Sequence, residues 1–159
     1  MKKLFFISLM SFLIAGFIEP SNGQDLTSQQ KSTIEKQVGT IFHEMVKAAE
    51  NLDYDQLSKG VDDRYHAGFI VNGSYFTQYD SLISSLKARS QGATRQSIVI
   101  TKEKITVLSD SIVLLTAYGD SKIDLSSGSS FTVKFYWSFV YKKTGDNWKV
   151  IQSHQSTVR

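Results

Sequence analysis

The sequence predicts an α+β domain in which three helices pack against an antiparallel β-sheet. Apolar residues recur every three or four positions after Ser32, which is typical of an amphipathic helix. The dipeptide Asn72-Gly73 is the strongest hairpin signal in the chain. From Gln96 onward, Val, Ile, Thr and aromatic residues alternate with polar ones between short turns, which indicates consecutive strands. These patterns predict one domain in the order helix, helix, short hairpin, helix and a four-stranded antiparallel meander.

The first predicted helix begins at about Ser32 and is the longest. Its polar face carries charged residues, and His43 lies beside the apolar stripe, where a solvated side chain is expected. The stripe itself is formed by Ile34, Val38, Ile41, Phe42, Met45, Ala49 and Leu52. This stripe is the surface that the helix should bury against the sheet.

Two further helices are predicted from their capping signals. Asp53 with Gln56 three residues later resembles a capping box and begins a short second helix. Thr77 with Asp80 has the same spacing and begins a third helix, which ends near Gly92.

Between the second and third helices, Arg64–Val71 is predicted to be a strand. Alternation places Tyr65 and His66 on opposite faces of it, so at most one of them points inward. After Asn72-Gly73, residues Ser74–Phe76 return as a short partner strand.

The remaining chain is predicted to form a four-stranded antiparallel meander that closes on a hairpin of Phe131–Tyr141 with Asn147–Thr157. In the first of these two strands one face is apolar and nearly all aromatic, which indicates a core-facing surface. That face comprises Phe131, Val133, Phe135, Trp137, Phe139 and Tyr141. In the return strand, strict alternation puts Trp148, Val150, Gln152, His154 and Ser156 on one face.

Residues 1–23 are predicted to be a signal peptide, with the basic Lys2-Lys3, the apolar run Leu4–Ile18 and small residues before Gln24. An uncleaved anchor is the alternative, although 15 residues are fewer than the roughly 20 that span a bilayer. We therefore expect an exported protein, periplasmic or secreted and free of the membrane after cleavage, with one domain over residues 24–159. The chain has no Cys, so no lipoprotein anchor, disulfide or thiolate metal site is expected.

Charge and motifs exclude several classes of partner. The formal net charge is +3, and it falls to +2 without the predicted signal because two Lys and one Glu leave with it. The basic residues are scattered rather than gathered in a stripe, so nucleic-acid binding is not expected. Phosphate-cradling loops, dinucleotide fingerprints and nucleophilic triads are absent, and no cofactor or metal is expected.

Three segments in the same order resemble the nuclear transport factor 2-like superfamily of SnoaL-like and ketosteroid isomerase-like domains. They are the break Ala48–Leu57, the hairpin Phe69–Gly73 followed by Ser81-Leu82, and the closing strand Gly145–Ser156 with its His-x-Ser match. The resemblance covers roughly residues 32–157. It implies a cone-shaped, cystatin-like fold in which a strongly bent antiparallel sheet and three helices enclose a pocket. The closing strand also resembles the association domain of calmodulin-dependent kinase II, which implies assembly, most simply as a homodimer.

The same resemblance indicates the site candidates. His154 and Ser156 fall on the strand that borders the family's pocket, and Tyr65 and His66 on a strand that can line its mouth. Ligand-binding candidates are His154, Ser156, Tyr65, His66, Tyr79, Tyr118 and Tyr136. His154 with Tyr65 is the candidate catalytic pair, and Tyr118 is the other possible partner of His154. A structural histidine and ordinary tyrosine packing remain the alternatives.

Three functions remain open from the sequence. The first is an exported domain that binds a small, largely apolar molecule. The second is a SnoaL-like or ketosteroid isomerase-like enzyme that transfers a proton with His154 and a tyrosine. The third is a dimerisation or assembly module. No Asp or Glu lies at an apolar strand position that would suit the carboxylate base of isomerase chemistry, which favours the first.

Overall fold

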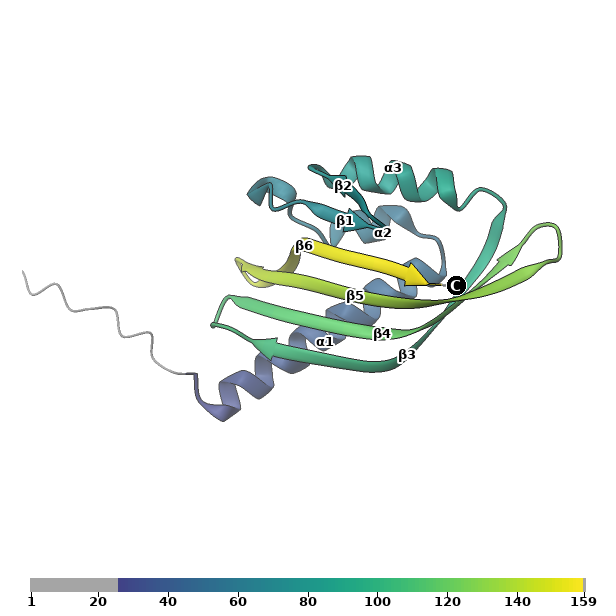
Figure 1. Cartoon of the computed structure of the whole chain (residues 1–159). Helices are drawn as coiled ribbons and strands as arrows, with labels where there is room; N and C mark the ends of the chain where they lie inside the picture. The colour runs from purple at the N-terminus through teal and green to yellow at the C-terminus, as the bar shows by residue number, and fades with distance from the viewer. Residues whose placement is uncertain (1–25, 159) are drawn as a thin grey trace, which may run out of the picture.

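The computed structural model describes residues 26–158, so the predicted signal peptide lies outside the described residues. Three α-helices, one 3-10 helix and six strands follow one another along this part of the chain (Figure 1). In order they are α1 (Ser28–Glu50), α2 (Tyr54–Lys59), η1 (Asp63–Tyr65), β1 (Phe69–Val71), β2 (Ser74–Phe76), α3 (Tyr79–Arg89), β3 (Ala93–Val107), β4 (Ile112–Leu125), β5 (Ser130–Thr144) and β6 (Asn147–Val158). No described helix is both long enough and apolar enough to cross a membrane.

All six strands belong to one curved sheet in the order β2-β1-β6-β5-β4-β3. The predicted four-stranded meander β3–β6 and the hairpin β1–β2 are confirmed. One pairing differs from the prediction, because β1 runs parallel to β6 and the sheet is therefore mixed. Figure 1 shows α1 behind the strands and α3 beside β1 and β2, so the helices and the inner face of the sheet form two layers.

Helix α1 begins at Ser28, four residues before the predicted start, because Thr27 caps it. The Thr27 hydroxyl accepts a hydrogen bond from the backbone N–H of Gln30 (3.2 Å), and the Gln30 side chain accepts one from the Thr27 N–H (2.8 Å). Of the predicted stripe, Val38 and Phe42 are fully buried. Phe42 packs against Phe139 of β5 with ring centroids 6.0 Å apart, which fixes the helix on the sheet.

The predicted strand Arg64–Val71 is wrong in its first half. The His66 N–H donates to the Asp63 carbonyl (2.9 Å) and closes a 3-10 turn, which the Asp62 side chain caps by accepting hydrogen bonds from the backbone N–H (3.3 Å) and Nε (2.8 Å) of Arg64. His66 follows in the left-handed region with φ 50°, which no strand residue adopts. Tyr65 and His66 therefore do not lie on the two faces of a strand.

The capping box predicted at Thr77 and Asp80 does not form either. The N-cap of α3 is Gln78, which makes no side-chain cap bond. Instead Asp63 Oδ2 accepts a hydrogen bond from the Tyr79 N–H (3.1 Å), so a carboxylate from a distant segment caps the helix.

A β-bulge in β6 overturns the predicted faces of that strand. Val140 of β5 pairs with Gln152 and Tyr141 with Val150, which leaves Ile151 as the extra residue. Trp148 and Val150 before the bulge are buried, but after it Ser153 is the buried residue (1% exposed) and His154 is exposed. Trp148 and His154 thus lie on opposite faces of the sheet, contrary to the strict alternation expected.

The aromatic face of β5 is the centre of the core, as predicted, except that Phe131 at its start is 37% exposed. Val133, Phe135, Phe139 and Tyr141 are buried, and Trp137 stacks on Phe135 with ring centroids 3.9 Å apart. Burial of each such side chain contributes roughly 1.5–3 kcal/mol. The core therefore forms between α1 and the inner face of the central strands.

Candidate functional site

A partly open cavity of about 450 Å³, called the interior cavity below, lies between the helices and the inner face of the sheet. Ligand pockets commonly have volumes of about 300–1,000 Å³, so a small molecule fits. Its walls come from all three α-helices, from the ends of β1, β3, β4 and β6, and from β5. The lining residues are Met45, Val46, Ala49, Leu52, Tyr54, Leu57, Val71, Asn72, Tyr79, Leu86, Arg89, Ser90, Gln91, Ala93, Gln96, Ile123, Leu125, Phe131, Val133, Trp137, Phe139, Gln155 and Thr157.

Most of this lining is apolar, and its polar residues are largely engaged with the protein. Tyr54 shares a hydrogen bond with the Ser90 hydroxyl. Tyr79 is buried and meets the Phe69 ring edge-on with centroids 5.1 Å apart, and burial raises its pKa well above the ordinary value for tyrosine. The Tyr79 hydroxyl is therefore neutral at physiological pH. Tyr79 is the one ligand-binding candidate from the sequence that lies in this cavity.

A polar cluster forms one part of the cavity wall, where the β1–β2 turn, the end of β6 and the end of α3 meet. Asn72 Oδ1 accepts hydrogen bonds from the Thr157 backbone N–H (2.7 Å) and hydroxyl (3.2 Å). Gln155 Nε2 donates to the Ser153 hydroxyl (3.2 Å). Arg89 Nη2 donates to the Ser74 hydroxyl (3.3 Å).

The lining holds no Asp, Glu, His or Lys, and Arg89 is its only ionised side chain. Proton abstraction needs a base within about 3 Å of the proton, directly or through one water, and neither a carboxylate nor an imidazole faces this cavity. Within residues 26–158 there is also no group of three or more His, Asp or Glu arranged to hold a metal ion. The geometry therefore supports binding better than acid–base chemistry at this position.

A second, shallower hollow of about 490 Å³ lies on the outer face of the sheet, and it collects four of the predicted ligand-binding residues. Tyr118 and Tyr136 are 43% and 49% exposed, and their rings stack with centroids 6.2 Å apart. His154 and Ser156 stand beside them on β6. The full lining is Lys102, Lys104, Thr116, Ala117, Tyr118, Tyr136, Trp137, Ser138, His154 and Ser156. The bulge at Ile151 is what places His154 here rather than inside.

Tyr65 and His66 line neither hollow. Tyr65 is exposed, and the Lys142 ammonium lies 5.4 Å from its ring centroid. Among the described residues, then, the pair His154–Tyr65 is not brought to a shared pocket, whereas His154 and Tyr118 share the outer one.

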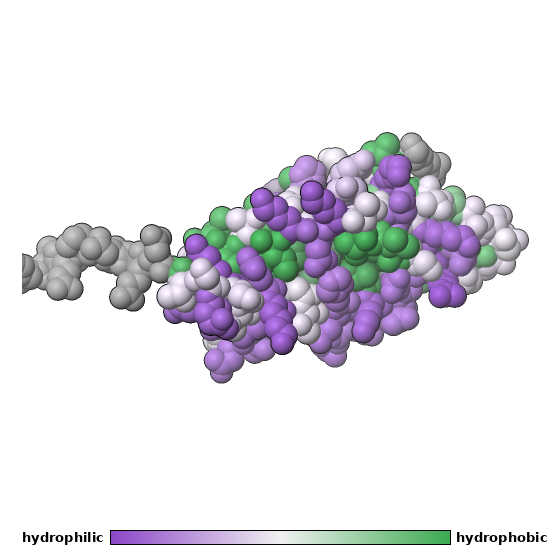
Figure 2. Space-filling model, turned by 90° about the horizontal axis from the view of Figure 1, so that it is seen from below, coloured by the Kyte–Doolittle hydropathy of each residue, from purple (hydrophilic) through white to green (hydrophobic). Residues whose placement is uncertain are grey.

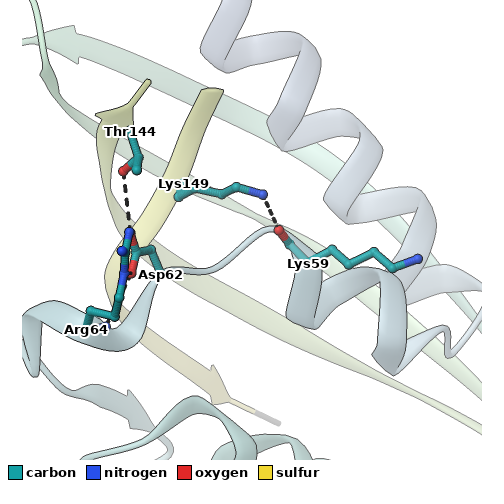
Figure 3. A network of polar contacts seen from close by, with 5 residues as sticks. All are labelled: Lys59, Asp62, Arg64, Thr144 and Lys149. Carbon is teal, nitrogen blue, oxygen red and sulfur yellow. Dashed lines mark hydrogen bonds and ion pairs between the residues drawn. The ribbon is translucent and has the colours of Figure 1, made fainter. Parts of the chain in front are cut away.

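Next to η1 lies a network of structural polar contacts, shown in Figure 3. Arg64 donates to both carboxylate oxygens of buried Asp62, with Nη2 to Oδ2 at 2.6 Å, and the Thr144 hydroxyl lies 3.5 Å from Oδ2. The hydrogen bonds from Arg64 lower the pKa of Asp62 to about 2 despite its burial. Beside them Lys149 Nζ donates to the carbonyl of Lys59 (Figure 3). The network joins η1, α2 and the β5–β6 hairpin.

The sheet has two edge strands, the short β2 beside α3 and the long, open β3, which is the lowest strand in Figure 1. From below, hydrophobic residues form a band bordered by hydrophilic ones (Figure 2). Along β3, Val99 is exposed, but Lys102, Glu103 and Lys104 follow it and two register shifts interrupt the ladder. Charges and bulges of this kind discourage edge-to-edge pairing, so the open edge is a poor docking surface.

Comparison with known proteins agrees with the fold. The model of the SnoaL-like domain family matches residues 38–159. No curated protein sequence shows a significant match to the chain.

Three solved structures share the fold. A candidate dehydratase of the nuclear transport factor 2-like family from Streptomyces avermitilis is 19% identical, with a TM-score of 0.69 over 80% of this chain and 99% of its own. A nuclear transport factor 2-like superfamily protein from Salmonella enterica is 10% identical, with a TM-score of 0.72 over 81% and 94%. The association domain of the calcium/calmodulin-dependent kinase II of C. elegans is 10% identical, with a TM-score of 0.65 over 82% and 99%. At these identities the likeness shows the fold alone.

Proposed function

Because the chain belongs to the SnoaL-like domain family, whose fold encloses a pocket, we propose that it is an exported protein that binds a small, largely apolar molecule in the interior cavity. The observation that carries the proposal is the lining of that cavity, which combines about 450 Å³ of space with mostly apolar walls and no Asp, Glu or His. Export rests on the signal-like pattern of residues 1–23 alone.

The proposal is tested by calorimetric titration of the mature protein with 1-decanol and related neutral alcohols. Ala49 lies on α1 in the cavity wall, so Ala49→Phe should fill space and weaken binding at least tenfold. Ser138 lies on the outer face, and Ser138→Phe adds a comparable ring without entering the cavity. If Ala49→Phe is poorly folded, Val133→Phe on β5 fills the same cavity from the opposite wall.

Saturable binding by the wild type and by Ser138→Phe, with loss in the cavity variants, is the expected result. Equal binding by all variants, or no saturable binding to any of the alcohols, would reject the cavity as the site.

We also propose that the protein is a homodimer through the outer face of the sheet. Tyr118 and Tyr136 form an exposed aromatic pair on that face, while the β3 edge is protected by charges. Large exposed aromatics gathered on one face are typical of a protein interface. Light scattering should give a dimer for the wild type and a monomer for Tyr136→Glu. A monomeric wild type would exclude the dimer and leave the cavity proposal intact.

The enzymatic alternative keeps His154 with a tyrosine as its proton-transfer pair. Tyr118 is the partner that the structure favours, because it lines the same outer hollow. This reading needs a second subunit to close the hollow, since His154 is exposed in the single chain. If the wild-type dimer turns over a substrate and His154→Gln does not, the enzymatic function is supported over ligand binding alone.

A further inference from the structure

Arg89 is the one ionised side chain among the described residues that line the interior cavity, and it is an exposed residue at the rim of that cavity. Arg89 occupies the last turn of α3 and has no carboxylate within ion-pair distance among residues 26–158. Its one hydrogen bond to a side chain is the 3.3 Å contact with the Ser74 hydroxyl, which uses one of five donors. The guanidinium therefore has donors free for a ligand.

We propose that the ligand is an amphipathic anion, whose apolar body fills the cavity and whose carboxylate or similar acidic group pairs with Arg89. This rests on the proposed function, because it concerns the same cavity. Guanidinium groups bind carboxylates through two parallel N–H···O bonds, and such charge-assisted bonds are about twice as strong as neutral ones.

The neighbours of Arg89 on the cavity wall suit an acid at the rim. Ser90, Gln91, Asn72 and Thr157 are polar and uncharged, so none repels an anion. Leu86 stands one turn before Ser90 on α3, and Met45, Val46 and Leu57 supply apolar wall from α1 and α2. An acid with an alkyl or ring body thus finds a charged group at one position and apolar surface elsewhere.

The helix dipole of α3 opposes anion binding at Arg89, so its strength must be compared with that of the guanidinium–carboxylate bond. The carbonyl end of α3 carries partial negative charge, which disfavours an anion near Arg89. That effect is screened and limited to the last turn, where Lys87 and Arg89 already compensate it. A two-point bond to a guanidinium is the larger contribution, so the balance favours an acid.

The matched probes are decanoate and 1-decanol, which have the same chain length and differ in the charged head. Both are titrated at pH 8 into the wild type, Arg89→Met and the control Arg95→Met. Arg95 is an exposed residue of β3 outside the cavity lining and makes no ion pair within the described chain, so the control removes the same charge.

Arg89→Met should weaken decanoate about tenfold or more and change 1-decanol less than about twofold, while Arg95→Met should leave both unchanged. Arg89→Lys should recover part of the lost decanoate affinity, because it restores the positive charge but not the two parallel N–H donors of the guanidinium. If Arg89→Met leaves decanoate binding unchanged while both probes still bind, the anion assignment is overturned and the cavity stands. If neither probe binds the wild type, the proposed function itself fails.

Discussion

Gly119 of β4 is predicted to be indispensable for the curvature of the sheet. It pairs with Ile100 of β3, while the next pair joins Tyr118 to Lys102, so Thr101 is the extra residue of a bulge. A Cβ atom on Gly119 would overlap the carbonyl oxygen of Val99 and lie 3.0 Å from the Thr101 nitrogen. The substitution Gly119→Ala therefore collides with backbone rather than with a movable side chain.

The cost follows from these neighbours. The same Cβ would lie 2.9 Å from Cζ of Phe135, a fully buried ring that has no space to retreat. Overpacking of this kind costs about 1–3 kcal/mol, and separating β3 from β4 at the bulge sacrifices at least one hydrogen bond worth about 1 kcal/mol. We expect Gly119→Ala to lower the free energy of unfolding by about 3 kcal/mol, with a fall in the melting midpoint of roughly 10 °C.

Urea denaturation of the mature protein, followed by circular dichroism, measures this difference. The matched control is Gly39→Ala on α1, where the added Cβ meets only Ile105 Cδ1 at 3.4 Å. Because alanine favours a helix more than glycine, that variant should gain about 0.5–1 kcal/mol. If Gly119→Ala proves as stable as the wild type, the bulge geometry described for β3 is incorrect.

Three further predictions concern stability. Asp62→Asn should lower the free energy of unfolding by about 1 kcal/mol at pH 7. This loss is smaller than the shift in pKa alone would give, because the Arg64 side chain is 74% exposed and solvent screens the ion pair. Because the carboxyl pKa is lowered to about 2 in the fold, this stabilisation is fully present above the unfolded value of 3.8, and the difference from wild type should shrink below pH 3.8 and vanish below about 2. Tyr141→Phe removes a buried hydroxyl that has no hydrogen-bond partner in the described chain, and denaturation should show a gain of about 1 kcal/mol. Phe42→Ala should cost about 3–5 kcal/mol in the same assay, because its fully buried ring packs on Phe139.

The parts of the fold that repeat a simple period could be predicted from the sequence. The centre of the α1 stripe at Val38 and Phe42 and most of the aromatic face of β5 appear where the periods of 3.6 and 2 place them, although Val46 and Ala48 are also buried and Phe131 is exposed. These elements are long, and each buries one face, so any other register would expose several large side chains.

The site was less predictable because two local events interrupt the period. The bulge at Ile151 turns His154 outward, and no residue in the strand marks it in advance. The hydrogen bond from the His66 N–H to the Asp63 carbonyl, with Asp62 as the cap, makes a 3-10 turn of a segment whose alternation indicates a strand. The sequence does not indicate Arg89 as a ligand-binding residue, because only the three-dimensional arrangement shows that no acidic side chain of the described residues pairs with it. The one feature of the sequence that points to it is its position in the last turn of a predicted helix.

The most direct test of the interior cavity uses the two tryptophans as reporters. Trp137 borders both hollows, but its ring packs on Phe135 and Phe139 at the inner face and lines the interior cavity. Trp148 does not line that cavity and donates from Nε1 to Gln37 (3.1 Å). A neutral brominated alcohol, 10-bromo-1-decanol, quenches indole fluorescence only at close range. It should quench Trp137 saturably in Trp148→Phe and affect Trp148 much less in Trp137→Phe, with circular dichroism confirming that both variants are folded. Weak quenching that rises linearly with concentration and is equal in the two variants would contradict binding inside the cavity.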